Sequence, residues 1–165
     1  MPSSLPGGIL LKNDNLDDLY RDIIMDHYKS PRGRKEIQDA DIVNEGKNPA
    51  CGDEIEVSMK VFGGRVDDIS VQCMGCAISV ASGSMLAETI KGKSIDEVKK
   101  IAGAIKAILT GEEPHDEIAL GDLEALQGVK KFPVRIKCAL LSWSTLIDGL
   151  EAWEDHQQAA ITTTE

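Results

Sequence analysis

The sequence predicts a mixed fold in which one antiparallel β-hairpin and several amphipathic helices form a single domain. Segments 54–62 and 66–73 alternate apolar and polar residues and flank Gly63 and Gly64, as in a hairpin with a tight turn. Before and after this hairpin, apolar residues recur at spacings of three and four, which is typical of helices. A chain of 165 residues with 42% hydrophobic content can bury one core.

The first predicted helix spans residues 16–28 and ends at Ser30 and Pro31. His27 lies on its apolar face, and we interpret it as a hydrogen-bonded core residue. The segment 32–41 that follows is charged and turn-like.

Two further helices are expected directly after the hairpin. The first begins at Cys76 and is rich in small residues, which predicts close packing and burial. The second begins with a capping-box pattern at Ser94 and Glu97 and ends at Gly111. Both helix starts therefore follow from local sequence signals.

The C-terminal third of the chain should contain an exposed segment and a last helix. Segment 112–128 is acidic and interrupted by proline and glycine, and we expect it to be exposed, with a short helical turn near 123–126. The last helix is predicted to open at Phe132 and Pro133. We expect one domain over residues 14–153, with flexible tails at 1–13 and 154–165.

Charge and hydropathy exclude several partners. A formal net charge of -10 argues against binding to nucleic acid or to an anionic membrane, because both would repel the chain. The sequence shows neither an apolar run that could span a bilayer nor a secretory signal, so we expect a cytoplasmic protein. In that compartment four cysteines favour reduced thiols or metal ligation over disulfides.

Three cysteines and one aspartate form a candidate metal site. Cys51, Cys76 and Cys138 each lie where a turn meets a regular element, and Asp53 stands two residues after Cys51. Three thiolates and one carboxylate suit zinc or an iron-sulfur cluster. Because one ligand is an exchangeable oxygen, the set favours chemistry or transfer over pure bracing.

The surroundings of these cysteines should stabilise thiolates. Cys76 and Cys138 are expected near helix N-termini, where the helix dipole lowers a thiol pKa. Basic residues, among them Arg135 and Lys137, surround Cys138 and could balance the negative charge of the site. The alternative is that this basic cluster is an ordinary solvated face.

Cys73 and Cys76 also form a CxxC pattern, which would suit a thioredoxin-like redox pair. That alternative leaves Cys51 and Cys138 unexplained, and a hairpin before the CxxC is not the order of elements that such a fold needs. Cys73 continues the inward-facing positions of its strand, so we interpret it as a buried, small apolar residue.

Four segments together resemble one family. They are LYRDIIMDHYKSPRGR, NPACGDEIEV, GCAISVASGSML and VRIKCALLSW, within residues 16–153. On them the chain resembles the U-type iron-sulfur cluster assembly proteins, which include IscU, SufU and the N-terminal part of NifU. The resemblance implies an α+β fold with a small antiparallel β-sheet packed against several α-helices. It also implies metal ligands at Cys51, Asp53, Cys76 and Cys138.

Two features place the resemblance in the SufU branch. Lys137 precedes the last cysteine, where IscU-type scaffolds carry a histidine, and the acidic stretch 112–128 lengthens the spacing between Cys76 and Cys138. The cysteine at position 73 departs from the pattern of either branch.

The SufU resemblance implies a zinc-bound sulfur acceptor that works with a pyridoxal-phosphate-dependent, SufS-like cysteine desulfurase and hands sulfur to downstream iron-sulfur assembly proteins. Cys51 would accept the persulfide sulfur, and Arg135 or Lys137 would give electrostatic support. Such a protein is a sulfurtransferase-type acceptor that acts with a desulfurase and not as a stand-alone catalyst. Two alternatives stay open: a scaffold for a [2Fe-2S] cluster, and a zinc-braced interaction module without sulfur chemistry.

Overall fold

A mixed sheet with helices on one face forms the centre of the molecule. The structure is a computed structural model that describes residues 12–113, 118–155 and 161–163. Within these ranges the elements are, in chain order, α2 (Lys12–Lys29), β1 (Ile42–Asn48), β2 (Asp53–Phe62), β3 (Arg65–Met74), α3 (Ala77–Ile90), α4 (Ile95–Thr110), the 3-10 helix η1 (Gly121–Lys131), α5 (Pro133–Glu154) and β4 (Ile161–Thr163).

The strands are ordered β3-β2-β1-β4, and the β1–β2 and β2–β3 pairs are antiparallel. The predicted hairpin is confirmed: Gly63 and Gly64 have φ values of 60° and 75° and form the turn between β2 and β3. At the opposite end of the sheet, Asn48 pairs with Asp53. On the other side of β2, Glu54 pairs with Met74, two residues before Cys76. The pairing therefore brings candidate ligands from distant parts of the chain to one end.

Strand β1 was not expected from the sequence. Its buried positions alternate as in any half-buried strand, but they carry Ile42, Asn44, Gly46 and Asn48. Two asparagines and a glycine hide the apolar alternation by which strands are recognised. Gly46 is needed because a methyl group there would overlap the Thr145 hydroxyl of α5. The inner face of β1 is therefore buried by close packing against α5 and not by large apolar side chains of its own.

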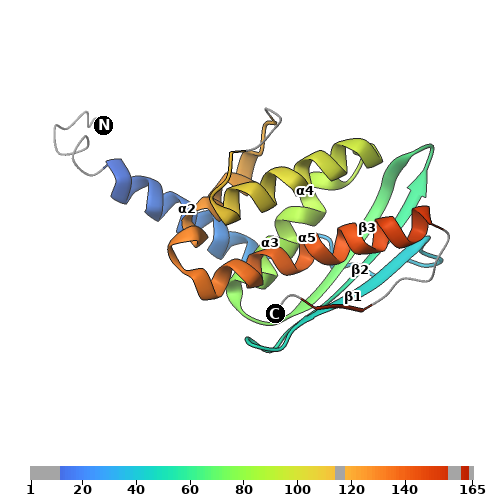
Figure 1. Ribbon diagram of the computed structural model, residues 1–165, viewed down its shortest axis with the longest axis horizontal. Helices are drawn as coiled ribbons and strands as arrows, with labels where there is room; N and C mark the ends of the chain where they lie inside the picture. The colour runs from blue at the N-terminus through green and yellow to red at the C-terminus, as the bar shows by residue number, and fades with distance from the viewer. Residues whose placement is uncertain (1–11, 114–117, 156–160, 164–165) are drawn as a thin grey trace.

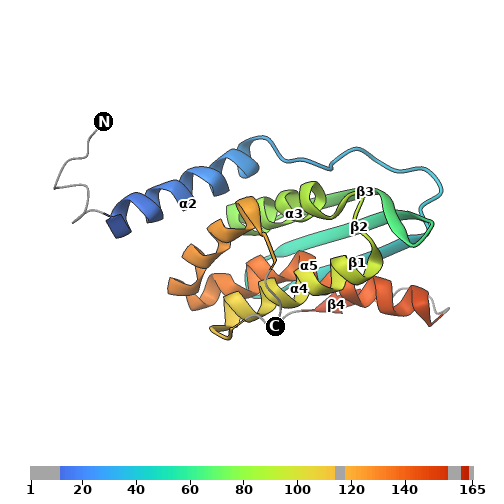
Figure 2. The same cartoon turned by 90° about the horizontal axis from the view of Figure 1, so that it is seen from above.

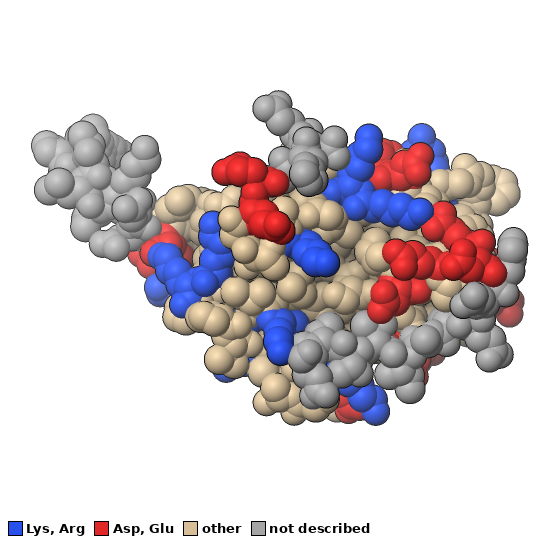
Figure 3. Space-filling view, viewed as in Figure 1, with Lys and Arg blue, Asp and Glu red and all other residues tan. Residues whose placement is uncertain are grey.

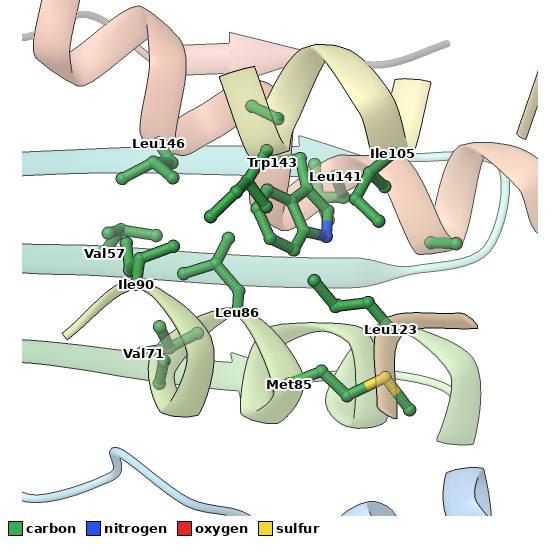
Figure 4. Packing of buried hydrophobic residues seen from close by; sticks show 14 of the residues in the cluster. Val57, Val71, Met85, Leu86, Ile90, Ile105, Leu123, Leu141, Trp143 and Leu146 are labelled. Atoms are coloured by element: carbon green, nitrogen blue, oxygen red, sulfur yellow. The ribbon is translucent and has the colours of Figure 1, made fainter. Parts of the chain in front are cut away.

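Helices α3 and α5 pack on the same face of the sheet, with α3 over β3 and α5 over β1 and β2 (Figures 1 and 2). Figure 4 shows Trp143 and Leu146 of α5 facing Leu86 of α3 and Val57 of β2. These four side chains are nearly or completely buried. The core thus fixes α5, and with it Cys138, against the sheet.

The capping signals predicted α4 correctly. The Ser94 side chain accepts from the Glu97 backbone, and the Glu97 side chain accepts from the Ser94 backbone. Gly111 ends the helix with a φ of 82°.

Within segment 112–128, the expected helical turn near 123–126 is confirmed, but the expected exposure is wrong for the second half. Residues 121–131 form η1, in which Leu123, Ala125, Leu126 and Val129 are buried. Helix η1 packs against α2, α3, α4 and α5. The acidic residues between the apolar ones masked this packing in the sequence. Residues 114–117 of this segment lie outside the described residues.

Helix α2 is attached to the core by His27, whose side chain is fully buried. Its Nδ1 lies 2.8 Å from Ser84 Oγ of α3, and its Nε2 lies 3.1 Å from Asp122 Oδ2 of η1. The interpretation of His27 as a hydrogen-bonded core residue is confirmed.

The short strand β4 pairs in parallel with β1 and was not predicted. The expected flexible tail at 1–13 lies almost entirely outside the described residues, and the proposed domain limits stay predictions. None of the helices in the described ranges has the length and apolar character needed to cross a membrane. Acidic side chains gather over the C-terminal end of α5 on the face seen in Figure 3, in keeping with the net charge of -10.

Candidate metal centre

Three junctions of the fold meet at the end of the sheet opposite the β2–β3 turn. The β1–β2 turn carries Cys51, and Asp53 is the first residue of β2. Cys76 is the N-cap of α3, and Cys138 lies in the second turn of α5. We call these four residues the Cys/Asp centre.

The β1–β2 turn holds Cys51 next to α5. The backbone N-H groups of Cys51 and Gly52 both donate to the Asn48 carbonyl oxygen, at 3.1 and 2.9 Å. Gly52 has a φ of 74°, which glycine adopts without strain. The turn brings Cys51 Sγ to 3.3 Å from Cys138 Sγ.

Asp53 is the buried oxygen donor of the centre, with 1% of its surface exposed. Its Oδ1 accepts from the Cys76 backbone N-H at 2.8 Å, and its Oδ2 accepts from the Ser79 hydroxyl at 2.6 Å. A methyl group at Gly75 would overlap this carboxylate. The β3–α3 junction therefore leaves room for Asp53 and fixes both of its oxygen atoms.

Cys76 caps α3 with its sulfur. Its Sγ accepts from the Ser79 backbone N-H at 3.5 Å and lies 3.9 Å from Asp53 Oδ2. Ser79 thus contacts two members of the centre, and the sequence analysis missed it. Its local signal is a polar residue three positions after the N-cap, but Ser82 and Ser84 in the same helix make that signal weak.

The pKa of the Cys138 thiol is raised, whereas a lowered pKa was expected for a thiol near a helix N-terminus. Burial raises the pKa of the Cys138 thiol, and hydrogen bonds with Cys51, Asp53 and Cys76 raise it further. Burial is the largest cause of this increase. A metal ion that bound here would displace the thiol proton, so metal affinity should increase with pH.

The two basic residues singled out by the sequence are placed differently. The pKa of Arg135 is raised, first by a hydrogen bond with Cys138 and then by attraction to the sulfurs of Cys76 and Cys138. Lys137 is exposed, and within the described ranges it makes no hydrogen bond or ion pair with the centre. Arg135 is thus the basic residue that meets the cysteines.

The Cys/Asp centre fits a metal ion by its chemistry and its spacing. Ligand atoms of Cys51, Asp53 and Cys138 all lie within 4.8 Å of one another and could hold a metal ion. Cys76 adds a third sulfur next to Asp53. Cys76 is therefore adjacent to the group of three and is not part of it. A donor set of three soft sulfurs and one carboxylate suits tetrahedral zinc.

Cys73 lies outside this centre and is buried, with 5% of its surface exposed, as the sequence predicted. Burial, followed by the nearby charges of Asp53 and Cys76, raises the pKa of Cys73 from 9.0 to about 12. All four cysteines are free in the described residues. A thiol that keeps its proton at neutral pH is a poor nucleophile, which argues against a Cys73–Cys76 redox pair.

The raised pKa of Cys73 predicts a loss of stability at alkaline pH. The folded state holds the thiol proton more tightly than the unfolded chain, so this contribution is constant below about pH 9 and falls as the pH rises toward 12. Between about pH 7 and about pH 10.5, the metal-free wild type should lose about 2 kcal/mol more unfolding free energy than Cys73→Ala. Urea unfolding at both pH values measures this, and equal losses in the two proteins would contradict it.

The comparisons with known proteins agree on one family. The chain matches the family model described as the NifU-like N terminal domain over residues 19–139, a range that contains the whole Cys/Asp centre. It is 49% identical over 138 residues to the zinc-dependent sulfurtransferase SufU of Bacillus subtilis, which covers 84% of this chain and 93% of that protein. It is 36% identical over 133 residues to the iron-sulfur cluster assembly scaffold protein IscU of Thermotoga maritima, with 81% and 93% covered.

A solved structure supports the same grouping. The structure of a protein from Fervidobacterium islandicum, named as an iron-sulfur cluster assembly scaffold protein for the SUF system, superposes with a TM-score of 0.73 at 37% identity. The superposition covers 78% of this chain and 93% of that chain. The α+β fold with a small antiparallel sheet is thereby confirmed. The chain belongs to the family of NifU-like N-terminal domains.

Proposed function

We propose that this protein is a zinc-dependent sulfurtransferase of the SufU type that serves iron-sulfur cluster assembly. The observation that carries the proposal is the Cys/Asp centre, in which three sulfurs and one buried carboxylate converge at one end of the sheet. The 49% identity to a zinc-dependent sulfurtransferase supports zinc as the metal.

The proposed ligands are Cys51, Asp53, Cys76 and Cys138. Zinc bound there would keep the cysteines deprotonated at neutral pH, which is the state that sulfur transfer needs. Asp53 is already oriented by Cys76 and Ser79, so the carboxylate needs no rearrangement to act as a ligand.

Cys51 is the proposed sulfur acceptor. It lies on a turn and is partly exposed, whereas Cys138 is buried in a helix. The Cys51 thiolate would attack the outer sulfur of a persulfide on the donor protein. A new sulfur-sulfur bond forms at Cys51 as the donor's bond breaks, so Cys51 becomes a persulfide and the donor cysteine leaves as a thiolate without net oxidation. Arg135, which already meets two of the sulfurs, can stabilise the added negative charge.

A sulfurtransferase needs a sulfur donor, and we propose a pyridoxal-phosphate-dependent cysteine desulfurase of the SufS type. Exposed apolar side chains close in sequence to the ligands offer a docking surface: Met74, Phe132 and Val134 are 73%, 59% and 70% exposed. Downstream iron-sulfur assembly proteins would receive the sulfur. A reducing compartment such as the cytoplasm would keep the four cysteines free for this role.

A second candidate function is a scaffold for a [2Fe-2S] cluster. It is favoured by the donor set, since sulfur ligands also bind iron, and by the Thermotoga maritima relative, which is named a scaffold protein. The two functions differ in the fate of the sulfur, which stays on a cysteine in the first and enters a cluster with iron in the second.

The proposed function is tested by the rate at which a cysteine desulfurase converts cysteine to alanine, with and without this protein. We expect the zinc-loaded protein to increase the rate, because an acceptor frees the donor cysteine for the next turnover. An unchanged rate, together with the absorbance of a [2Fe-2S] cluster after iron is added, would favour the scaffold. If the rate is unchanged and no cluster absorbance appears, the remaining alternative is the zinc-braced interaction module.

A further inference from the structure

Asn48 is a buried polar residue whose presence the packing of the core does not explain. It is fully buried at the end of β1, and its Oδ1 has no hydrogen-bond partner in the described part of the chain. An unpaired buried oxygen destabilises a fold, whereas an apolar residue of similar shape would not. The amide nitrogen of Asn48, in contrast, does have a partner: Nδ2 lies 3.7 Å from Cys138 Sγ.

The same residue shapes the turn that presents Cys51. The Asn48 carbonyl accepts the N-H groups of Cys51 and Gly52, at 3.1 and 2.9 Å. Asn48 therefore contacts both cysteines of the closest sulfur pair in the centre, whose Sγ atoms lie 3.3 Å apart. Through its backbone it positions Cys51, and through its side chain it donates to Cys138.

The three sulfurs of the centre consequently receive different hydrogen bonds. Cys138 accepts from Asn48 Nδ2 inside the fold and from the exposed Arg135 side chain, and Cys76 accepts from the Ser79 backbone N-H at 3.5 Å and from Arg135. Within the described residues, Cys51 Sγ receives a hydrogen bond from the Cys138 thiol and from no N-H or hydroxyl group. That donor is itself a sulfur of the centre, so within the described residues Cys51 has no donor from outside the centre.

A hydrogen bond from an amide N-H to a thiolate lowers the nucleophilicity of the sulfur, because it stabilises the negative charge that attacks an electrophile. A thiolate without such a bond reacts faster. The pattern of donors therefore sets an order of reactivity in which Cys51 precedes Cys138, although the two sulfurs are neighbours.

We propose that Asn48 is a positioning residue that protects the Cys138 thiolate with its side-chain amide and so directs an incoming sulfur to Cys51. The choice of sulfur as the electrophile rests on the proposed function. The order of reactivity does not, because it holds for any electrophile that reaches the centre.

Limited alkylation of the zinc-loaded protein with iodoacetamide tests the order of reactivity. Peptide mass mapping gives the ratio of modified Cys138 to modified Cys51, which should be small in the wild type. We expect the ratio to increase about tenfold in Asn48→Leu, because one hydrogen bond to a charged group is lost. Asn48→Ala removes the same donor and tests the effect with a smaller side chain.

Asn44→Leu is the matched control. Asn44 lies on the same buried face of β1, and its Nδ2 donates to the Thr145 carbonyl at 3.0 Å, away from the cysteines. This variant should leave the alkylation ratio unchanged.

Two further readouts separate positioning from a structural role. In the protein loaded with Co²⁺, the thiolate-to-metal charge-transfer band should move to longer wavelength in both Asn48 variants, because the thiolate loses a stabilising donor. The urea midpoint of metal-free Asn48→Leu should equal or exceed that of the wild type, since the unpaired oxygen is removed.

An unchanged alkylation ratio in both Asn48 variants with zinc still bound would overturn the proposal, as would an equal increase in Asn44→Leu. Alkylation needs no sulfur donor. A protein with the expected order of reactivity that never accepts sulfur would therefore contradict the proposed function and leave the role of Asn48 intact.

Discussion

Cys51→Ala is expected to lower sulfur acceptance from a desulfurase persulfide by at least about a hundredfold, because the attacking atom itself is removed. Cys138, the nearest other thiolate, is buried and hydrogen-bonded by Asn48, so it cannot substitute efficiently. The measurement is the initial rate of transfer of labelled sulfur from the loaded desulfurase to this protein.

The control for this prediction is Cys73→Ala, which also removes one of the four cysteines. Cys73 is buried, and its pKa is raised to about 12, so its loss should leave the transfer rate within about twofold of the wild type. If Cys51→Ala still accepted sulfur at the rate of Cys73→Ala, the assignment of Cys51 as the acceptor would be wrong.

Asp53→Ala is expected to lower zinc affinity by at least about a hundredfold, since removal of a group that merely orients a ligand already lowers affinity by about 10- to 100-fold. The change also removes the acceptor of the Cys76 N-H and the Ser79 hydroxyl. The metal-free protein should therefore lose about 2 kcal/mol of unfolding free energy. Competition with a chromophoric zinc chelator measures the affinity, and urea unfolding measures the stability.

Glu54→Ala is the appropriate comparison for Asp53→Ala. Glu54 is the next residue of β2, points to the exposed face and forms an ion pair with Lys47 at 3.6 Å. Its removal should change zinc affinity by less than about twofold, because an exposed ion pair contributes little. Equal zinc affinities of the two variants would remove Asp53 from the ligand set.

The sequence predicted those parts of the fold whose signals are local. The hairpin followed from alternation around Gly63 and Gly64, and α4 followed from the pairing of Ser94 with Glu97. Burial of Cys73 followed from its place in the inward-facing half of β3. Each of these signals lies within a few residues of the structure that it specifies.

The features that were missed depend on contacts between distant segments. Strand β1 is buried through Asn44, Gly46 and Asn48 because it lies close to α5, and the sequence of β1 carries no sign of that neighbour. The acidic residues of η1 likewise concealed a helix that packs on four others, α2, α3, α4 and α5.

The candidate site, like the fold, could be predicted only in part. Its four proposed ligands could be named from residue type and from the family resemblance, and the structure brings them together. The residues that orient them, Asn48 and Ser79, could not be identified, because a buried amide and a buried hydroxyl acquire a role only through the sulfur or carboxylate that the fold places beside them. For the same reason the sequence did not distinguish Arg135 from Lys137.

The most direct test of the central claim is native mass spectrometry of the protein purified without oxygen, before and after incubation with a cysteine desulfurase and cysteine. The account predicts one zinc ion per chain before the reaction. Afterwards it predicts the mass of one additional sulfur atom, mapped to Cys51 by fragmentation. A chain that carries two irons and two sulfides would contradict it, and so would a metal-free chain lighter by two hydrogens, which would indicate a Cys73–Cys76 disulfide.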